Sequence, residues 1–150
     1  AVSYIDENGI LKSFKRDELN FSYRRSVFTD KEYIVTDVLF KLENKSQNEI
    51  REKMDELMGK RKSKQPLEYP SAGSTFKRPE GYFAAALIEE CGLKGASVGG
   101  AEVSEKHSGF IINKNNATCE DVKNLIAYVK KEVYKQKGVE LHCEVKFIGI

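Results

Sequence analysis

Hydrophobic and polar residues alternate from the beginning of the chain, which is the pattern of a β-strand with one buried face. The alternation over residues 2–14 is centred on Asn8-Gly9, a pair that favours a two-residue hairpin turn because both positions tolerate a positive φ. A short turn or helix at 17–20 and a strand at 33–42 are predicted next. Because so small a sheet is marginal in water, we expect further strands to pair with it.

The pattern changes to a helical period after residue 45. Ser46 and Glu49 have the spacing of a capping box, which marks the beginning of a helix. Four apolar residues then recur on one helical face: Ile50, Met54, Leu57 and Met58. The cations of its last turns suit an anionic ligand, but they also suit the helix dipole, and both interpretations stay open.

A short buried helix is predicted over residues 82–91, because its apolar residues share one side and a glycine follows. Residues 96–103 and 109–113 are predicted to form paired strands joined by a polar turn. Gly99-Gly100 would be a bulge in the first of these strands.

A long helix is predicted next, with Thr118 and Asp121 as its capping pair and Gly138 at its end. Its apolar stripe contains five residues: Val122, Leu125, Ile126, Val129 and Val133. A last strand is expected over 139–148. The second half therefore predicts an α+β fold with helices packed on one face of a sheet.

Composition narrows the possible functions. The 150 residues are 40% hydrophobic and 32% charged, with a net charge of +2. This small basic excess does not indicate a nucleic-acid partner, and no apolar run is long enough to predict a membrane partner. Lys60, Arg61, Lys62 and Lys64 form a local basic cluster, which leaves a nucleotide- or RNA-binding domain as a weaker alternative.

Cysteine and histidine residues predict neither disulfides nor a metal site. Cys91, Cys119 and Cys143 form no CxxC pair, and three thiols cannot all be paired within one chain. His107 and His142 lack the spacing of metal ligands. We therefore expect a reducing, cytoplasmic environment.

The segment over residues 64–79 is the strongest candidate for chemistry. It is expected to be an irregular loop in which the Ala72-Gly73-Ser74 turn places one hydroxyl among Lys64, Lys77 and Arg78. Such a loop suits a phosphorylated or carboxylated ligand. Ser74 lies in no GxSxG elbow, so the residues alone do not name a reaction.

Four segments carry a resemblance to a known family. They are YRRSVF at 23–28, KQPLEYPSAGSTFKRPEGYFA at 64–84, GLKGASVGGAEVSEKHSGFIIN at 92–113 and LHCEVKFIG at 141–149. Their order and spacing resemble those of the UDP-N-acetylenolpyruvoylglucosamine reductases. The resemblance implies a cytoplasmic flavoenzyme of peptidoglycan synthesis that makes UDP-N-acetylmuramate with FAD and NADPH.

The resemblance also implies a division of the chain. Residues 1–65 would be the trailing part of an α+β FAD-binding domain, residues 66–140 a compact α+β substrate-binding domain, and residues 141–150 a final strand returning towards the flavin. The amino-terminal half of the same enzyme would be a missing partner, holding the strands that complete the first sheet. The short span from Ser74 to Tyr82 implies the shorter subtype of the family.

Three residues resemble the catalytic residues of the family. Ser74 would protonate the substrate, while Arg24 and Glu144 would flank the enolpyruvyl carboxylate. These residue types suit the chemistry, because a fixed guanidinium and a carboxyl donor can stabilise negative charge as it develops on the substrate.

Binding roles follow from the same resemblance. Tyr23 would line the substrate channel, Lys64 and Arg78 would contact the substrate diphosphate, and His107 would lie on a turn near the substrate. Arg61 would lie on the flavin side. An alternative is a catalytically silent nucleotide-sugar-binding module, because flavin binding in this family depends mainly on the amino-terminal half. We therefore expect this chain alone to bind little FAD and to be inactive.

Overall fold

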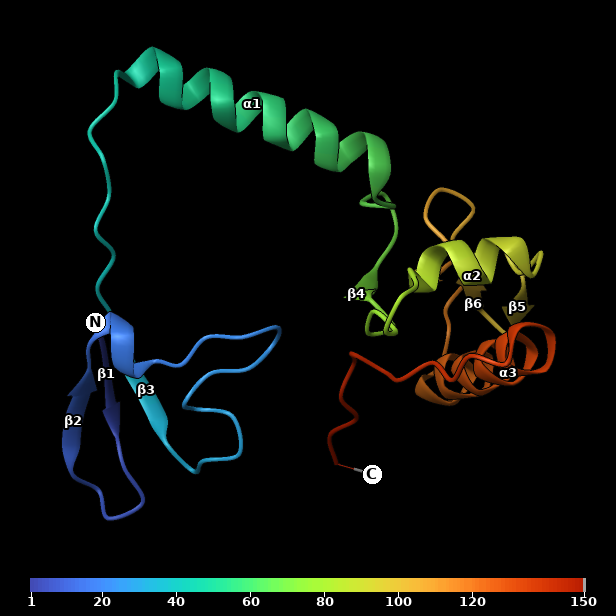
Figure 1. Cartoon of the computed structure of the whole chain (residues 1–150). Helices are drawn as coiled ribbons and strands as arrows, with labels where there is room; N and C mark the ends of the chain where they lie inside the picture. The colour runs from blue at the N-terminus through green and yellow to red at the C-terminus, as the bar shows by residue number, and fades with distance from the viewer. Residues whose placement is uncertain (150) are drawn as a thin grey trace. The chain divides into compact units, whose positions relative to one another are not determined.

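The computed structural model describes residues 1–149, which fall into two compact units divided between residues 47 and 48 (Figure 1). Residue 150, the last of the predicted 141–150 segment, lies outside the described residues. Both units contain an antiparallel sheet, which confirms the predicted α+β class for the chain.

The first unit is a three-stranded sheet in the order β2-β1-β3. β1 (Val2–Ile5) and β2 (Leu11–Phe14) form the predicted hairpin, but its turn is longer than the two residues expected. The Asp6 backbone N–H donates to the Ile10 carbonyl at 3.0 Å, and of Asn8 and Gly9 it is Gly9 that has a positive φ, 77°. A 3-10 helix, Arg16–Glu18, lies where the short turn or helix was expected. β3 (Ile34–Val38) is shorter than the predicted strand, because its partner β1 begins at Val2, opposite Val38.

Aromatic rings form much of the small core of this unit. Tyr4 is 4% exposed and stacks on Phe14 and Tyr33, with ring centroids 4.7 and 4.8 Å apart. Phe28 meets the Tyr4 ring edge-on at 5.5 Å. β3 contributes little to this core, because all five of its residues are exposed.

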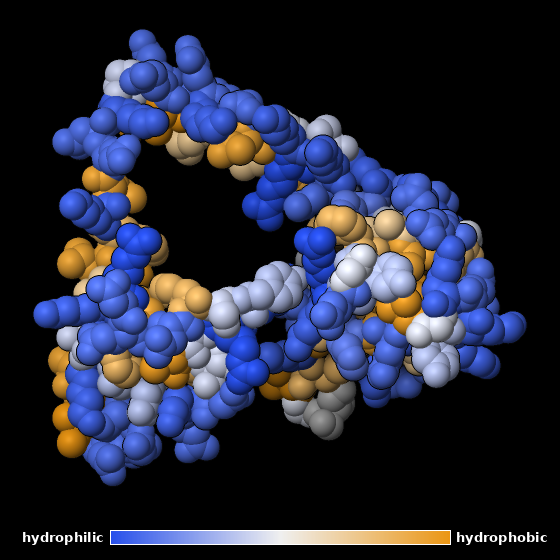
Figure 2. Space-filling model, viewed as in Figure 1, coloured by the Kyte–Doolittle hydropathy of each residue, from blue (hydrophilic) through white to orange (hydrophobic). Residues whose placement is uncertain are grey.

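The helix α1 (Gln47–Lys64) confirms the element that the capping box predicted. None of its residues is buried. Its apolar stripe is therefore visible along one flank in Figure 2, formed by Ile50, Met54, Leu57 and Met58.

The second unit packs two helices on one face of a four-stranded antiparallel sheet (Figure 1). The sheet has the order β4-β7-β6-β5. Its elements in chain order are β4 (Ser71–Ser74), α2 (Ala84–Glu90), β5 (Ser97–Val98), β6 (Ala101–Val103), β7 (Phe110–Asn113) and α3 (Cys119–Lys137). This arrangement is the helices-on-one-face layer that the sequence predicted.

α3 joins the core of this unit through one face. Leu125, Val129 and Val133 are fully buried there, and Leu87 and Ile88 of α2 pack in the same cluster. Both predicted ends of α3 are confirmed. Thr118 and Asp121 form a reciprocal capping box, and Gly138 ends the helix in the left-handed conformation, with a φ of 67°.

Three expectations about the second unit were wrong. The segment over 64–79 is not wholly irregular, because residues 71–74 pair with β7 as an edge strand. Gly99-Gly100 is a turn rather than a bulge, and it folds β5 back against β6. Residues 139–149 form no regular strand, since their pairing with a neighbouring segment is limited to an isolated bridge between Phe76 and Cys143.

Candidate active site

Ser74 ends the edge strand β4 and is exposed. The register between β4 and β7 shifts between Ser71 and Ser74, and Gly73 within this irregularity has a φ of 83°. A side chain would be strained at that φ, so glycine allows the chain to turn here. The next residue, Thr75, is buried, and its backbone N–H donates to the Gly109 carbonyl at 2.8 Å. The Ser74 backbone is thus fixed by its buried neighbour while its hydroxyl faces outward.

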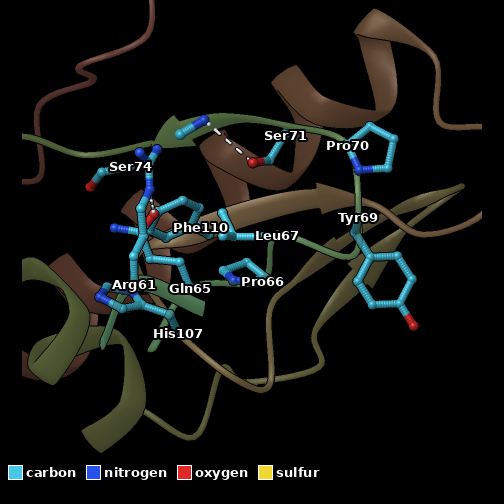
Figure 3. Close-up of a pocket in the computed structure, with 11 residues that line it drawn as sticks. Arg61, Gln65, Pro66, Leu67, Tyr69, Pro70, Ser71, Ser74, His107 and Phe110 are labelled. Atoms are coloured by element: carbon cyan, nitrogen blue, oxygen red, sulfur yellow. Dashed lines mark hydrogen bonds between the residues drawn. The ribbon is translucent and has the colours of Figure 1, made fainter. Parts of the chain in front are cut away.

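A pocket of about 610 Å³ opens beside Ser74 (Figure 3). It brings together three of the predicted site residues, which come from different elements: Ser74 from β4, Arg61 from α1 and His107 from the turn before β7. Figure 3 shows Tyr69 at the opposite end of the view from these residues. The remaining lining residues are Gln65, Pro66, Leu67, Pro70, Ser71, Gly73 and Phe110.

Arg61 reaches the pocket from the last turn of α1. Its Nε donates to Oε1 of Gln65 at 3.2 Å, and the Gln65 backbone N–H donates to the Arg61 carbonyl at 2.9 Å. The backbone contact places Gln65 at the end of the helix, and its side chain holds the guanidinium there. The pocket therefore has a cation on the same lining as the Ser74 hydroxyl.

His107 is half-buried and is oriented by its own turn. Its Nδ1 accepts a hydrogen bond from the Gly109 backbone N–H at 3.1 Å, and its ring meets Phe110 edge-on at 5.0 Å. A neutral imidazole whose Nδ1 accepts carries its proton on Nε2. His107 is therefore arranged to donate a hydrogen bond from Nε2.

Glu144 is placed beside the Ser74 strand by pairing between segments. Its backbone N–H donates to the Thr75 carbonyl at 2.9 Å, and the Lys77 N–H donates to the His142 carbonyl at 2.8 Å. Glu144 itself is half-buried, and its Oε2 is inaccessible to solvent. Although the predicted strand is absent, this pairing brings the predicted carboxyl residue next to the neighbour of Ser74.

Lys64 and Arg78 belong to the second unit but do not line the pocket. Lys64 is the exposed last residue of α1. Arg78 lies over the ring of Phe83, with its Cζ 3.9 Å from the ring centroid. Their predicted contacts with a diphosphate stay predictions.

Arg24 and Tyr23 belong to the first unit. Both are exposed, and the Arg24 Cζ lies 5.7 Å from the Tyr23 ring centroid. Arg24 has a φ of 56°, an uncommon backbone conformation for arginine. Their roles also stay predictions.

Sequence reasoning missed two contributors to the pocket. Gln65 holds Arg61, and its place directly after the basic cluster was the available signal. Tyr69 contributes a ring whose centroid lies 4.7 Å from the Lys114 Nζ. These two residues are 45 positions apart, and the sequence gave no signal for their contact.

Within residues 1–149, no group of three or more histidine, cysteine or acidic side chains is arranged to hold a metal ion. The same residues include no helix that combines the length and apolar character needed to cross a membrane.

The second unit falls in a known class of carboxy-terminal enzyme domains, since a family model matches residues 65–148. That model is described as UDP-N-acetylenolpyruvoylglucosamine reductase, C-terminal domain, and the chain belongs to this family. The resemblance inferred from the four sequence segments is thereby confirmed.

Relatives of known name agree with this assignment. A UDP-N-acetylenolpyruvoylglucosamine reductase of Clostridium perfringens (strain SM101 / Type A) is 55% identical over 149 residues, which are 99% of this chain and 49% of that protein. The same named protein of Caldanaerobacter subterraneus subsp. tengcongensis is 55% identical over 148 residues, again 99% of this chain and 49% of that protein. The chain thus spans about half the length of these curated relatives.

A solved structure agrees in fold. The crystal structure of the UDP-N-acetylenolpyruvylglucosamine reductase from Thermus caldophilus matches with a TM-score of 0.78 and 34% sequence identity. The match covers 97% of this chain and 51% of that chain.

Proposed function

We propose that this chain is the carboxy-terminal part of a cytoplasmic reductase that converts UDP-N-acetylenolpyruvoylglucosamine to UDP-N-acetylmuramate during peptidoglycan synthesis. One observation carries the proposal. The pocket gathers a hydroxyl and an oriented imidazole from Ser74 and His107, which lie in the region matched by the family model, and a guanidinium from Arg61, which lies four residues before that region. These groups suit an anionic nucleotide sugar, because they offer hydrogen-bond donors and positive charge together.

Ser74 is the proton donor in this proposal. Reduction of the enolpyruvyl double bond places a hydride on the β-carbon and a proton on the α-carbon. The exposed Ser74 hydroxyl would give its proton to the α-carbon and recover one from solvent. The fixed backbone at Thr75 would limit the motion of the Ser74 backbone, which lowers the entropic cost of the transfer.

Glu144 and Arg24 would stabilise the negative charge that develops on the α-carbon and its carboxylate. Pairing of Glu144 with Thr75 supports its part in this role, because it keeps the Glu144 backbone next to the residue that follows Ser74, although Glu144 does not line the pocket. Arg24 would supply a guanidinium from the first unit. A preorganised charge is effective here, since it needs no reorganisation during the reaction.

The flavin of FAD, reduced by NADPH, would supply the hydride when bound. The residues of this chain fit only part of FAD. Arg61 offers a cation on the pocket lining, whereas the sequence contains no G-x-G-x-x-G run to hold a diphosphate. The amino-terminal half of the enzyme would hold the rest of the cofactor, so the isolated chain is expected to bind little FAD.

The alternative is that this chain works by itself as a nucleotide-sugar-binding module without activity. The compact core of the second unit favours this possibility, because it can support a binding site independently of the first unit.

Titration calorimetry of this chain with UDP-N-acetylenolpyruvoylglucosamine tests both possibilities. We expect a Kd in the micromolar range, which Lys64→Ala raises about tenfold. Ser74→Ala should change the Kd little, because the Ser74 hydroxyl acts in the transition state rather than in substrate binding. Ser97→Ala, an exposed serine on β5, is the matched control. If this chain did not bind UDP-N-acetylenolpyruvoylglucosamine, it would not be a nucleotide-sugar-binding module by itself.

Activity is tested by joining this chain to the amino-terminal half of the Clostridium perfringens relative. We expect substrate-dependent NADPH oxidation that Ser74→Ala lowers by at least a hundredfold. Ser97→Ala should leave the rate unchanged. A Ser74→Ala protein with full activity would remove Ser74 from the proposed chemistry.

A further inference from the structure

A turn that the proposed chemistry does not use brings an arginine and an aromatic ring together. The Tyr82 backbone N–H donates to the Pro79 carbonyl at 3.2 Å, which closes the turn over residues 79–82. Gly81 has a φ of 74°, the positive value that the third position of a type II turn requires. The residues on either side of this turn, Arg78 and Phe83, therefore meet.

Arg78 is held by two contacts in this arrangement. Its Cζ lies 3.9 Å from the centroid of the Phe83 ring, and its Nε donates to the Tyr82 backbone carbonyl at 3.3 Å. A planar guanidinium stacks well on an aromatic face. Because Nε is used by Tyr82, the two terminal amino groups are the donors left to form a fork.

The ring beneath Arg78 rests on a fixed support. Phe83 directly precedes α2, whose Ala84, Leu87 and Ile88 are buried in the core of the second unit. Although Phe83 is 62% exposed, its backbone is thus anchored at the beginning of a packed helix. The exposed face of this anchored ring is the one over which the Arg78 guanidinium lies.

The charges around Arg78 favour an anion. No carboxylate lies within ion-pair distance of its guanidinium among residues 1–149. Lys77 precedes it, and Glu80 in the turn is the nearest acidic residue in sequence. The stacked guanidinium therefore keeps its terminal donors for an outside partner.

We infer that Phe83 is a positioning residue that holds Arg78 as a subsite for the diphosphate of a nucleotide. The inference rests on the proposed function, which supplies the nucleotide sugar. A guanidinium fork matches two oxygens of a phosphate group, and stacking reduces the side-chain freedom that binding must otherwise remove. Phe83 does not touch the ligand in this arrangement and acts through Arg78.

Titration calorimetry with UDP and with uridine tests the inference on this chain. UDP contains the diphosphate but no enolpyruvyl carboxylate, and uridine contains neither. The difference in affinity between UDP and uridine therefore measures the contribution of the phosphates. We expect Phe83→Leu to raise the Kd for UDP about three- to fivefold and to leave uridine binding unchanged. Phe83→Tyr keeps an aromatic face and should bind UDP like the unchanged chain.

Matched variants separate positioning from stability. Tyr134→Leu removes an equally exposed ring, 62% exposed on α3, and should change neither Kd. Arg78→Lys keeps the charge but loses the planar fork, so it should weaken UDP binding at least as much as Phe83→Leu. The Nε–H signal of Arg78 in NMR spectra should shift when the ring current is removed by Phe83→Leu and return with Phe83→Tyr.

The outcomes are distinct. If the unchanged chain binds UDP and Phe83→Leu has no effect on the Kd, the inference fails and the nucleotide-sugar module stands. If Phe83→Leu raised the Kd for UDP and for uridine by the same factor, the inference would also fail, because the effect would not depend on the phosphates. If the unchanged chain binds no UDP, the inference fails together with the module on which it rests.

Discussion

The two units of the chain use apolar residues in opposite ways. In the second unit, Leu125, Val129 and Val133 of α3 are fully buried against the sheet. In the first unit, every residue of β3 is exposed, and Leu39 and Phe40 just after it are each 74% exposed. Both units carry sequence patterns of buried elements, but the second unit buries its pattern more completely within the described structure.

Exposed apolar residues lie on β3 of the first unit and along α1. Monomeric proteins rarely expose continuous apolar patches, and such patches commonly mark interfaces. The named relatives are about twice as long as this chain. The rest of the second unit buries apolar residues in a core of its own.

The largest expected effect contrasts a core leucine with an exposed one. Leu125→Ala should lower the free energy of unfolding of the second unit by about 3 kcal/mol, because it leaves a cavity among packed side chains. Leu39→Ala should change the stability of this chain by less than about 0.5 kcal/mol. Urea unfolding followed by NMR signals of each unit measures both effects. Similar losses from the two variants would contradict the contrast.

A helix cap gives a smaller effect within the second unit. Thr118 accepts a hydrogen bond from the Asp121 backbone N–H at 3.1 Å, and Asp121 in turn accepts from the Thr118 N–H at 2.9 Å. Thr118→Ala should therefore cost about 1 kcal/mol of unfolding free energy. Thr118→Ser keeps the hydroxyl and should restore most of the loss in the same measurement. A full loss with serine would assign the effect to packing of the threonine methyl group instead.

The sequence predicted those elements that local interactions determine. The hairpin at Asn8-Gly9 and the capping box at Thr118 were found because turn and cap residues act over two to four positions. The capping box at Thr118 also predicted the beginning of α3, which starts at the next residue, Cys119.

Elements that depend on distant partners were harder to predict. β4 was expected to be a loop because its four residues, Ser71 to Ser74, carry no β-branched or aromatic side chain. Its partners Ile112 and Phe110 lie 41 and 36 residues further along the chain. The strand expected over 139–148 has a suitable pattern but finds only one bridge partner.

The candidate site shows the same division. The resemblance supplied Ser74, Arg61 and His107, and the structure places all three on one pocket. Gln65 and Tyr69 required the structure, because their contacts with Arg61 and Lys114 depend on side-chain placement in the fold.

The smallest expected effect is the dependence of the first unit on pH. The hydrogen bond from Lys12, 2.5 Å from the Asp6 carboxylate, is the main cause that lowers the pKa of Asp6 below its ordinary value of 3.8. The backbone N–H groups of Ile10 and Asn8 act in the same direction, while burial opposes them. The Lys12 side chain is 50% exposed, so solvent screens the pair and limits its contribution.

Because the folded pKa is lowered, this stabilisation is fully present above pH 3.8 and is lost as the pH falls through the folded pKa. Asp6→Asn keeps an oxygen for the two backbone donors but loses the ion pair, so the hairpin should be less stable at pH 6 and change less on acidification. The signals of the Tyr4 ring report the first unit, since acid also affects Asp121 in the second unit, whose pKa is lowered by its hydrogen bonds with Thr118. If the hairpin of Asp6→Asn lost as much stability in acid as the unchanged chain, the pair with Lys12 would not be the source of the pH dependence.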